Sequence, residues 1–149
     1  MTHASSKEKK DKMKRNNKTL HLPLFAKYYI MIEEGVKPEE YRDLTPYWFK
    51  RLLELNDEGE YLKKIDENVA SFYCRKENYD KLVHMIQSSL FKYKDYDFVD
   101  FSYGYTTRRM KYKITGMRIG FGKPCWGAPE DRPVFIIGIG DRVNDERVG

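Results

Sequence analysis

The pattern of apolar and polar residues predicts the order of elements in the first third of the chain. Residues 19–24 alternate apolar with polar up to a proline, which is typical of a half-buried strand. Apolar residues then recur at helical spacing and stop at Gly35, so we expect a helix over about 24–34. A second strand is expected to begin at 40–42. Thr45-Pro46 is typical of a helix start, with threonine as N-cap and proline in the first turn.

The segment over about 57–93 is predicted to be an inserted helical hairpin. Apolar residues fall at helical spacing in two groups, from Leu62 to Phe72 and from Tyr79 to Leu90. Apolar helix faces of this kind usually belong to a core, so we assign them no chemistry.

Strand patterns return after Asp95. Residues 99–103 and 110–114 alternate around a turn at 104–107, which predicts a β-hairpin. The apolar positions shift by one residue at Gly116, as a β-bulge would cause. Residues 134–139 are apolar on both faces and predict a central strand. This order predicts an α+β fold built on a small, strongly curved β-barrel.

A short charged stretch follows the first predicted helix and has a conformation restricted by its own sequence. Gly35 stands where a left-handed residue is expected to end the helix. Pro38 fixes its own φ and favours an extended conformation for Lys37. Glu40 and Arg42 are two residues apart, so on a strand they project to the same side. We therefore expect Lys37, Glu40 and Arg42 to line one polar cleft.

The pattern G-x-K-x-x-E-x-R is matched at Gly35, Lys37, Glu40 and Arg42. On this signature the chain resembles the ASCH domain family, a branch of the PUA-like β-barrels. The resemblance covers about residues 18–143 apart from the inserted helices. It implies a PUA-like barrel with a helix and the signature loop over one mouth. It also implies that RNA, single-stranded nucleic acid or a nucleotide binds in the cleft beside the signature.

The residue types near the signature suit such a ligand. Lys37 and Arg42 could hold phosphate, and Glu40 could accept hydrogen bonds from a base or brace a neighbouring cation. Stacking rings and further cations could come from the hairpin and from the loop after residue 121; these candidates are Tyr103, Tyr105, Arg108, Arg109 and Trp126. The alternatives are core packing for the tyrosines, a solvated edge for the arginines, and a plug at one barrel end for Trp126.

Two other classes of function remain open from the sequence. Some relatives in the family are small hydrolases, and Lys37 with Glu40 could form an acid/base pair acting on RNA or a modified nucleoside. In the amidohydrolase relatives a threonine stands where this chain has Glu40, which removes the expected hydroxyl nucleophile. The third class is a protein-interaction module, which a large exposed apolar patch on residues 57–93 would favour.

Charge and composition narrow the setting. The chain has 149 residues and a net charge of +5. Residues 1–18 hold seven basic and two acidic residues and so account for that whole charge. We expect 1–17 to be a disordered basic tail, either binding phosphates or only solubilising, and 144–149 to be a loose end. Scattered histidines and two isolated cysteines predict no metal site, and we expect no cofactor. Without an apolar span or signal peptide, we expect a cytoplasmic protein with no membrane partner.

Overall fold

The computed structural model describes residues 18–57 and 61–144 of the chain. The tail expected over 1–17 lies outside this part. So does the loose end expected over 144–149, apart from Asn144. None of the helices within the described ranges is long and apolar enough to cross a membrane.

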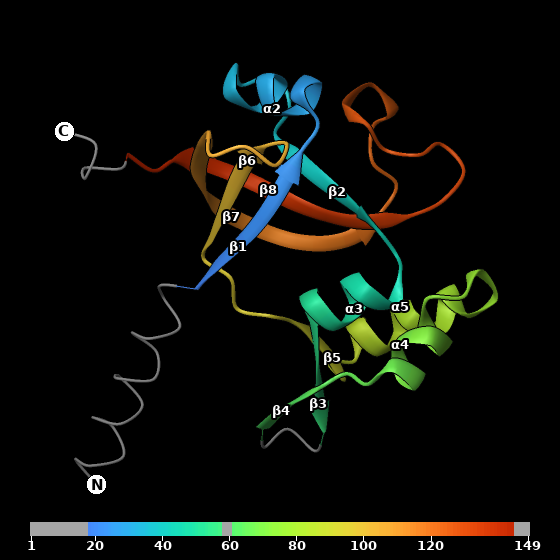
Figure 1. Cartoon of the computed structure of the whole chain (residues 1–149). Coiled ribbons are helices and arrows are strands. Elements are labelled where there is room, and N and C mark those ends of the chain that lie inside the picture. Colours follow the sequence, from blue (N-terminus) through green and yellow to red (C-terminus); the bar gives the residue numbers. More distant parts are fainter. Residues whose placement is uncertain (1–17, 58–60, 145–149) are drawn as a thin grey trace, which may run out of the picture.

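Five strands form one curled sheet in the order β1-β6-β7-β8-β2 (Figure 1). They are β1 (Thr19–Leu24), β2 (Glu39–Asp43), β6 (Phe98–Tyr103), β7 (Arg109–Gly120) and β8 (Val134–Arg142). β1 runs parallel to β6, and the other neighbours are antiparallel. The sheet curls into a half-barrel whose two edge strands are β1 and β2. We call the gap between these edges the seam.

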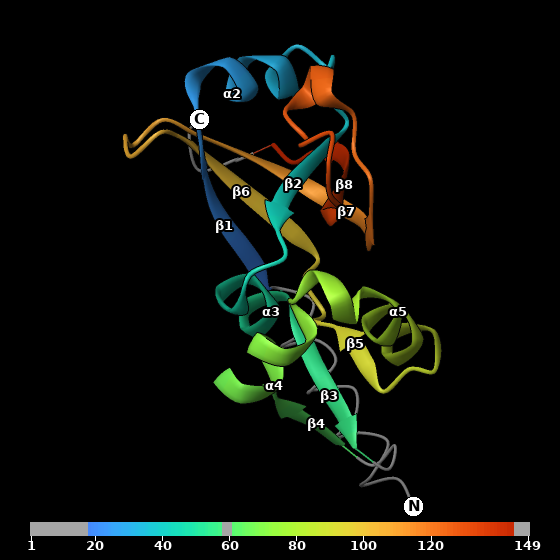
Figure 2. The same ribbon diagram turned by 90° about the vertical axis from the view of Figure 1, so that its right-hand side faces the viewer.

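Two helices cover the ends of the half-barrel, as Figure 2 shows. α2 (Ala26–Glu33) lies over one mouth, and Gly35 follows it with a φ of 78°, so the predicted left-handed helix end is confirmed. α3 (Pro46–Leu52) lies at the opposite end, and its backbone N–H at Trp48 donates to the Thr45 hydroxyl. Phe49 of α3 packs edge-on against Phe135 of β8, with ring centroids 5.4 Å apart.

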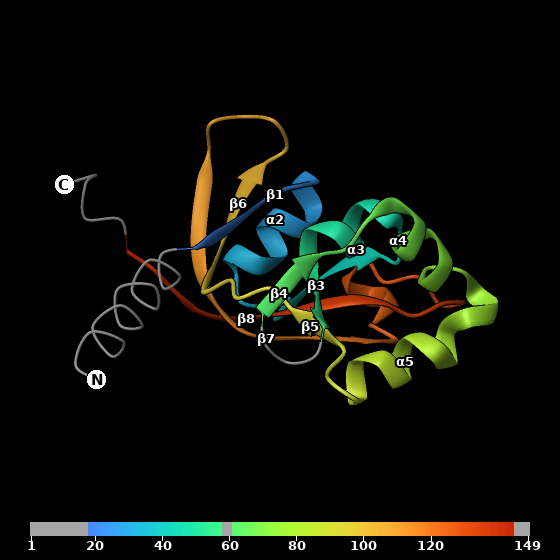
Figure 3. The ribbon, with the colours of Figure 1, turned by 90° about the horizontal axis from the view of Figure 1, so that it is seen from below.

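Residues 53–93, which include the expected hairpin, contain both expected helices and, in addition, a small sheet that the periodicity did not predict. The helices are α4 (Glu67–Tyr73) and α5 (Tyr79–Gln87), joined by a short turn, η1 (Lys76–Asn78). The sheet has the order β4-β3-β5, from strands β3 (Leu53–Asp57), β4 (Tyr61–Lys64) and β5 (Phe91–Tyr93). Figure 3 shows the helices on one side of this sheet. The helix predicted from Leu62 therefore begins only at Glu67, after the Asp66 side chain accepts the N–H of Val69.

Two apolar clusters hold the parts together. The main core continues from the half-barrel into residues 53–93, because Leu82 and Phe91 belong to the same cluster as Phe101 and Phe135. A smaller cluster covers the outer face of β2 and β8 and consists of Tyr41, Ala128, Val134 and Ile136. β8 is thus buried on both faces, which confirms the predicted central strand. The second cluster also fixes the long loop that leads into β8.

The predicted β-bulge is present in β7, but the glycine that it requires lies on the neighbouring strand, β8. Ile114 pairs with Ile139 and Gly116 pairs with Gly138, so Thr115 is the extra residue. A Cβ at Gly116 would meet nothing within 4 Å, whereas a Cβ at Gly138 would lie 2.3 Å from the Thr115 hydroxyl oxygen. The bulge therefore needs a glycine at 138 rather than at 116.

We expect Gly138→Ala to lower the free energy of unfolding by about 1–3 kcal/mol, because the new methyl group must displace Thr115. Gly116→Ala is the matched control and should change it by no more than about 0.5 kcal/mol. Thr115→Ala in the Gly138→Ala background should restore most of the loss. Urea denaturation of the four proteins checks this, and equal losses at both glycines would contradict it.

Candidate binding cleft at the seam

A cleft of about 550 Å³ opens beside the seam, where β1 ends and β2 runs past it. Its walls come from segments far apart in the sequence: the end of β1, the start of α2, strand β2, helix α3, the hairpin turn after β6 and the loop before β8. Six aromatic residues line these walls: Phe25, Tyr28, Tyr41, Trp48, Tyr105 and Trp126. Glu40 and Arg42 provide charge in the same cleft. Strand β2 therefore does place Glu40 and Arg42 on one side, as their spacing predicted.

Lys37, Glu40 and Arg42 form a continuous chain of charges. The Lys37 ammonium lies 3.2 Å from Oε1 of Glu40, and Nη2 of Arg42 lies 3.1 Å from Oε2 of the same carboxylate. The exposed fractions of the three side chains are 0%, 6% and 19% in chain order. Both oxygens of Glu40 are engaged, so its carboxylate braces the two cations. The order of burial leaves Arg42 as the member nearest the solvent.

Lys37 does not line the cleft, contrary to the expectation from sequence. Its ammonium donates a 2.7 Å hydrogen bond to the carbonyl oxygen of Trp126 and lies 4.4 Å from the centroid of the Tyr41 ring. This contact ties the signature loop to the loop that contains η2 (Pro124–Trp126). Burial lowers the pKa of the Lys37 amine, and the carboxylate of Glu40 partly opposes that shift. Lys37 thus lies beneath the cleft wall and holds the loop of Trp126 in place through this hydrogen bond.

Arg42 spans the seam between the two edge strands. Its Nη2 donates to the carbonyl oxygen of Pro23 on β1 at 3.0 Å, while its guanidinium lies 5.1 Å from the centroid of Trp48. Arg51 repeats the arrangement one step along: it donates to the carbonyl of His21 at 3.0 Å and lies 5.6 Å from the same indole ring. Nε of Arg42 is buried and has no hydrogen-bond partner among the described residues.

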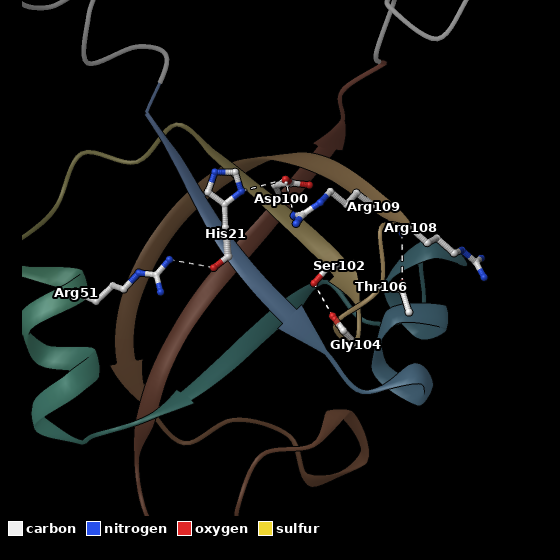
Figure 4. Close-up of polar contacts among 8 residues, drawn as sticks. All are labelled: His21, Arg51, Asp100, Ser102, Gly104, Thr106, Arg108 and Arg109. Carbon is white, nitrogen blue, oxygen red and sulfur yellow. Dashed lines mark hydrogen bonds and ion pairs between the residues drawn. The ribbon is translucent and has the colours of Figure 1, made fainter.

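The hairpin residues expected at the site are divided by the structure. Tyr105 lines the cleft and is 98% exposed, so its ring is free to contact a ligand. Tyr103 instead packs edge-on against Tyr29, with centroids 5.3 Å apart. Arg108 pairs with Glu33 of α2, and Arg109 pairs with Asp100 on the outer face of β6 (Figure 4). Neither arginine lines the cleft.

Sequence reasoning missed several residues that the cleft does contain. Tyr28 and Trp48 fall at helical spacing, so the pattern assigned them to core-facing helix surfaces. Arg132 lies in the loop before β8, where no local pattern marks it. It pairs with Asp43 at 3.3 Å and with Asp131 at 3.0 Å. Their meeting in one cleft depends on the folded loop before β8 and could not be predicted from a local sequence pattern.

The charge in the cleft is small for its size. The charged lining residues are two acids, Glu40 and Asp43, and two bases, Arg42 and Arg132. The ammonium of Lys37 lies directly behind Glu40 and adds one positive charge. A wall with six aromatic rings and a slight positive excess suits a planar aromatic ligand that carries few negative charges.

Comparison with models of known protein families, with curated proteins and with solved structures finds no match for this chain.

Proposed function

We propose that the seam cleft binds a nucleotide, both free and as part of single-stranded RNA, and that the chain is an ASCH-like domain. The observation that carries the proposal is the position of Arg42, which is braced by Glu40 in a cleft lined by six aromatic rings. Bases stack on aromatic side chains, and guanidinium groups pair with phosphate. The G-x-K-x-x-E-x-R signature supports the same assignment, because two of its charged residues line this cleft.

Roles follow from the geometry. Tyr105 offers an unobstructed ring at the cleft rim, and Trp126 offers a second ring on the opposite loop. Arg42 is the cation for a phosphate, since it is held in place by Glu40 and still reaches the cleft. Glu40 and Lys37 position Arg42 and the loop wall without touching the ligand.

We expect Tyr105→Ala to weaken binding of a nucleoside monophosphate by about 1–3 kcal/mol, the usual value of base–aromatic stacking. The free energy of unfolding should stay the same, because the side chain is 98% exposed and buries almost nothing. Isothermal titration with the four nucleoside monophosphates and a thermal melt measure both quantities.

Phe121→Ala is the matched control, since Phe121 is also exposed, at 64%, but does not line the cleft. It should leave nucleotide affinity unchanged. If both substitutions weaken binding equally, or if none of the four nucleotides binds the unchanged protein, the proposed function is wrong.

The other two function classes gain no support from the geometry. An acid/base role would require Lys37 to exchange protons with a substrate, but its side chain is 0% exposed and its ammonium is bound to Glu40 and the Trp126 carbonyl. A docking surface on the insertion would require a large apolar patch. The described part of 57–93 has only two exposed large apolar residues, Phe72 and Leu90, each about two-fifths exposed. We therefore propose binding alone.

A further inference from the structure

The outer face of β1, β6 and β7 is an open polar surface, and of its aligned residues only Pro23 also lines the cleft. Strand pairing aligns its outward residues in three rows across the sheet. The rows are Thr19–Phe98–Lys113, His21–Asp100–Lys111 and Pro23–Ser102–Arg109. Inward neighbours such as Met110 and Tyr112 are buried, so β7 presents its three cations to solvent on one side. We call this surface the β7 basic face.

Most of the charge on the β7 basic face is unneutralised. Its only acid is Asp100, which pairs with Arg109 at 3.1 Å and with His21 at 3.0 Å (Figure 4). Lys111 lies 4.7 Å from the centroid of the Phe98 ring, and neither Lys111 nor Lys113 has an ion pair in the described part of the chain. Three cations and one acid therefore share this surface.

The spacing of the cations is regular. Alternate residues of a strand lie about 6.8 Å apart, so Arg109, Lys111 and Lys113 follow one another along β7 with about that repeat. Successive phosphates of an extended single strand are separated by a comparable distance. The line of cations along β7 ends near the point where the chain enters the sheet. Lys113 lies in the same row across the sheet as Thr19, which directly follows the basic residues of 1–18.

We propose that the β7 basic face is a second binding surface, which holds the phosphate backbone of single-stranded RNA without reading its sequence. The choice of RNA as the polyanion rests on the proposed function of the cleft; the surface itself does not. The face would hold the strand by its phosphates while the cleft binds one nucleotide. Affinity should consequently grow with strand length, beyond what one nucleotide in the cleft provides.

A lipid surface fits this face less well than RNA. The exposed large apolar residues of the described chain all lie elsewhere, and Phe98 on the face is only partly exposed and covered by Lys111. Insertion into a membrane interface needs apolar side chains that project from the surface. A row of cations with almost no exposed apolar area instead favours a soluble polyanion.

The test removes two cations from the face and compares the loss with the same change elsewhere. Lys111→Gln/Lys113→Gln is the variant, and Lys76→Gln/Lys92→Gln is the control, with two exposed lysines of the insertion. Fluorescence anisotropy with a single-stranded RNA of about 12 nucleotides is recorded at several salt concentrations. We expect the slope of log affinity against log salt to fall by about 1.4 in the variant, because each phosphate contact on a single strand contributes about 0.7. The control should keep the slope of the unchanged protein.

A nucleoside monophosphate separates the two sites. The variant should bind it as the unchanged protein does, because neither lysine lines the cleft. If the nucleotide does not bind but the RNA slope still falls in the variant alone, the proposed function is wrong and the β7 basic face stands. If the nucleotide binds and both lysine pairs change the RNA slope equally, or not at all, the face is not an RNA surface. Loss of binding only to phosphatidylserine vesicles would also overturn the inference.

Discussion

Glu40→Gln should lower the free energy of unfolding by about 3–5 kcal/mol, the cost of leaving a buried charge without its partner. The substitution keeps the shape of the side chain but removes the anion that both Lys37 and Arg42 contact. Lys37 would keep only neutral acceptors, the carbonyl oxygen of Trp126 and the amide oxygen of the substituted side chain, while its own side chain stays fully buried. Urea denaturation at neutral pH measures the loss.

The loss should depend on pH in a defined direction. Burial already lowers the pKa of Lys37, and without Glu40 that pKa falls further. Between the folded-state pKa and about 10.4, the unfolded chain holds the proton and the folded chain does not. Stability of the variant must therefore rise with pH through this window, and its stability relative to the unchanged protein rises between the two folded-state pKa values of Lys37. Lys37→Met in the Glu40→Gln background should remove this pH dependence.

Glu67→Gln is the control for charge removal alone. Glu67 pairs with Lys50 on the surface, with 62% of its side chain exposed, so its removal should cost no more than about 1 kcal/mol. Similar losses for Glu40→Gln and Glu67→Gln would show that the Lys37–Glu40–Arg42 chain contributes no more than a surface ion pair.

Gly127→Ala should have the second-largest effect, with a loss of about 2–4 kcal/mol from backbone strain and overlap combined. Gly127 has a φ of 101°, and a Cβ there would lie 2.7 Å from Cζ of Tyr28. The neighbouring carbonyl oxygen of Trp126 accepts a hydrogen bond from the Lys37 ammonium, so displacement of this loop also disturbs the cleft wall. We expect weaker nucleotide binding together with lower stability, measured by titration and urea denaturation.

Gly104→Ala separates backbone strain from overlap. Gly104 also has a positive φ, 58°, but a Cβ there would meet nothing within 4 Å. Gly104→Ala should lower the free energy of unfolding by about 1–2 kcal/mol, the cost of an alanine in the left-handed conformation. If Gly127→Ala costs no more than Gly104→Ala, the contact with Tyr28 does not shape the cleft.

The sequence predicted the parts of the fold that local rules decide. The left-handed Gly35, the Thr45 helix start and the shared side of Glu40 and Arg42 each depend on a few neighbouring residues. The burial of Lys37 could not be predicted, because its acceptor on Trp126 lies 89 residues further along the chain. A lysine beside a proline gives no sign of such a partner.

The same limit explains the small sheet and the aromatic walls of the cleft. β3 pairs with β5, which follows it only after two helices, so short strands of mixed composition gave no reliable local pattern. Trp48 and Tyr28 repeat at helical spacing whether they face a core or a cleft. The pattern placed Tyr103 at the end of a strand and Tyr105 in a turn, but it could not show that Tyr103 packs against Tyr29 while Tyr105 stays exposed.

The arginines at the seam have a consequence for how the protein behaves at high concentration. An edge strand with free carbonyl and amide groups is a template on which a strand of another molecule can add, and such additions lead to aggregates. On β1, Arg51 and Arg42 occupy the carbonyls of His21 and Pro23, and Pro23 has no amide proton to offer. The Trp48 ring lies against both guanidiniums and restrains them. The open side of this half-barrel is thereby protected against edge-to-edge association without a sixth strand.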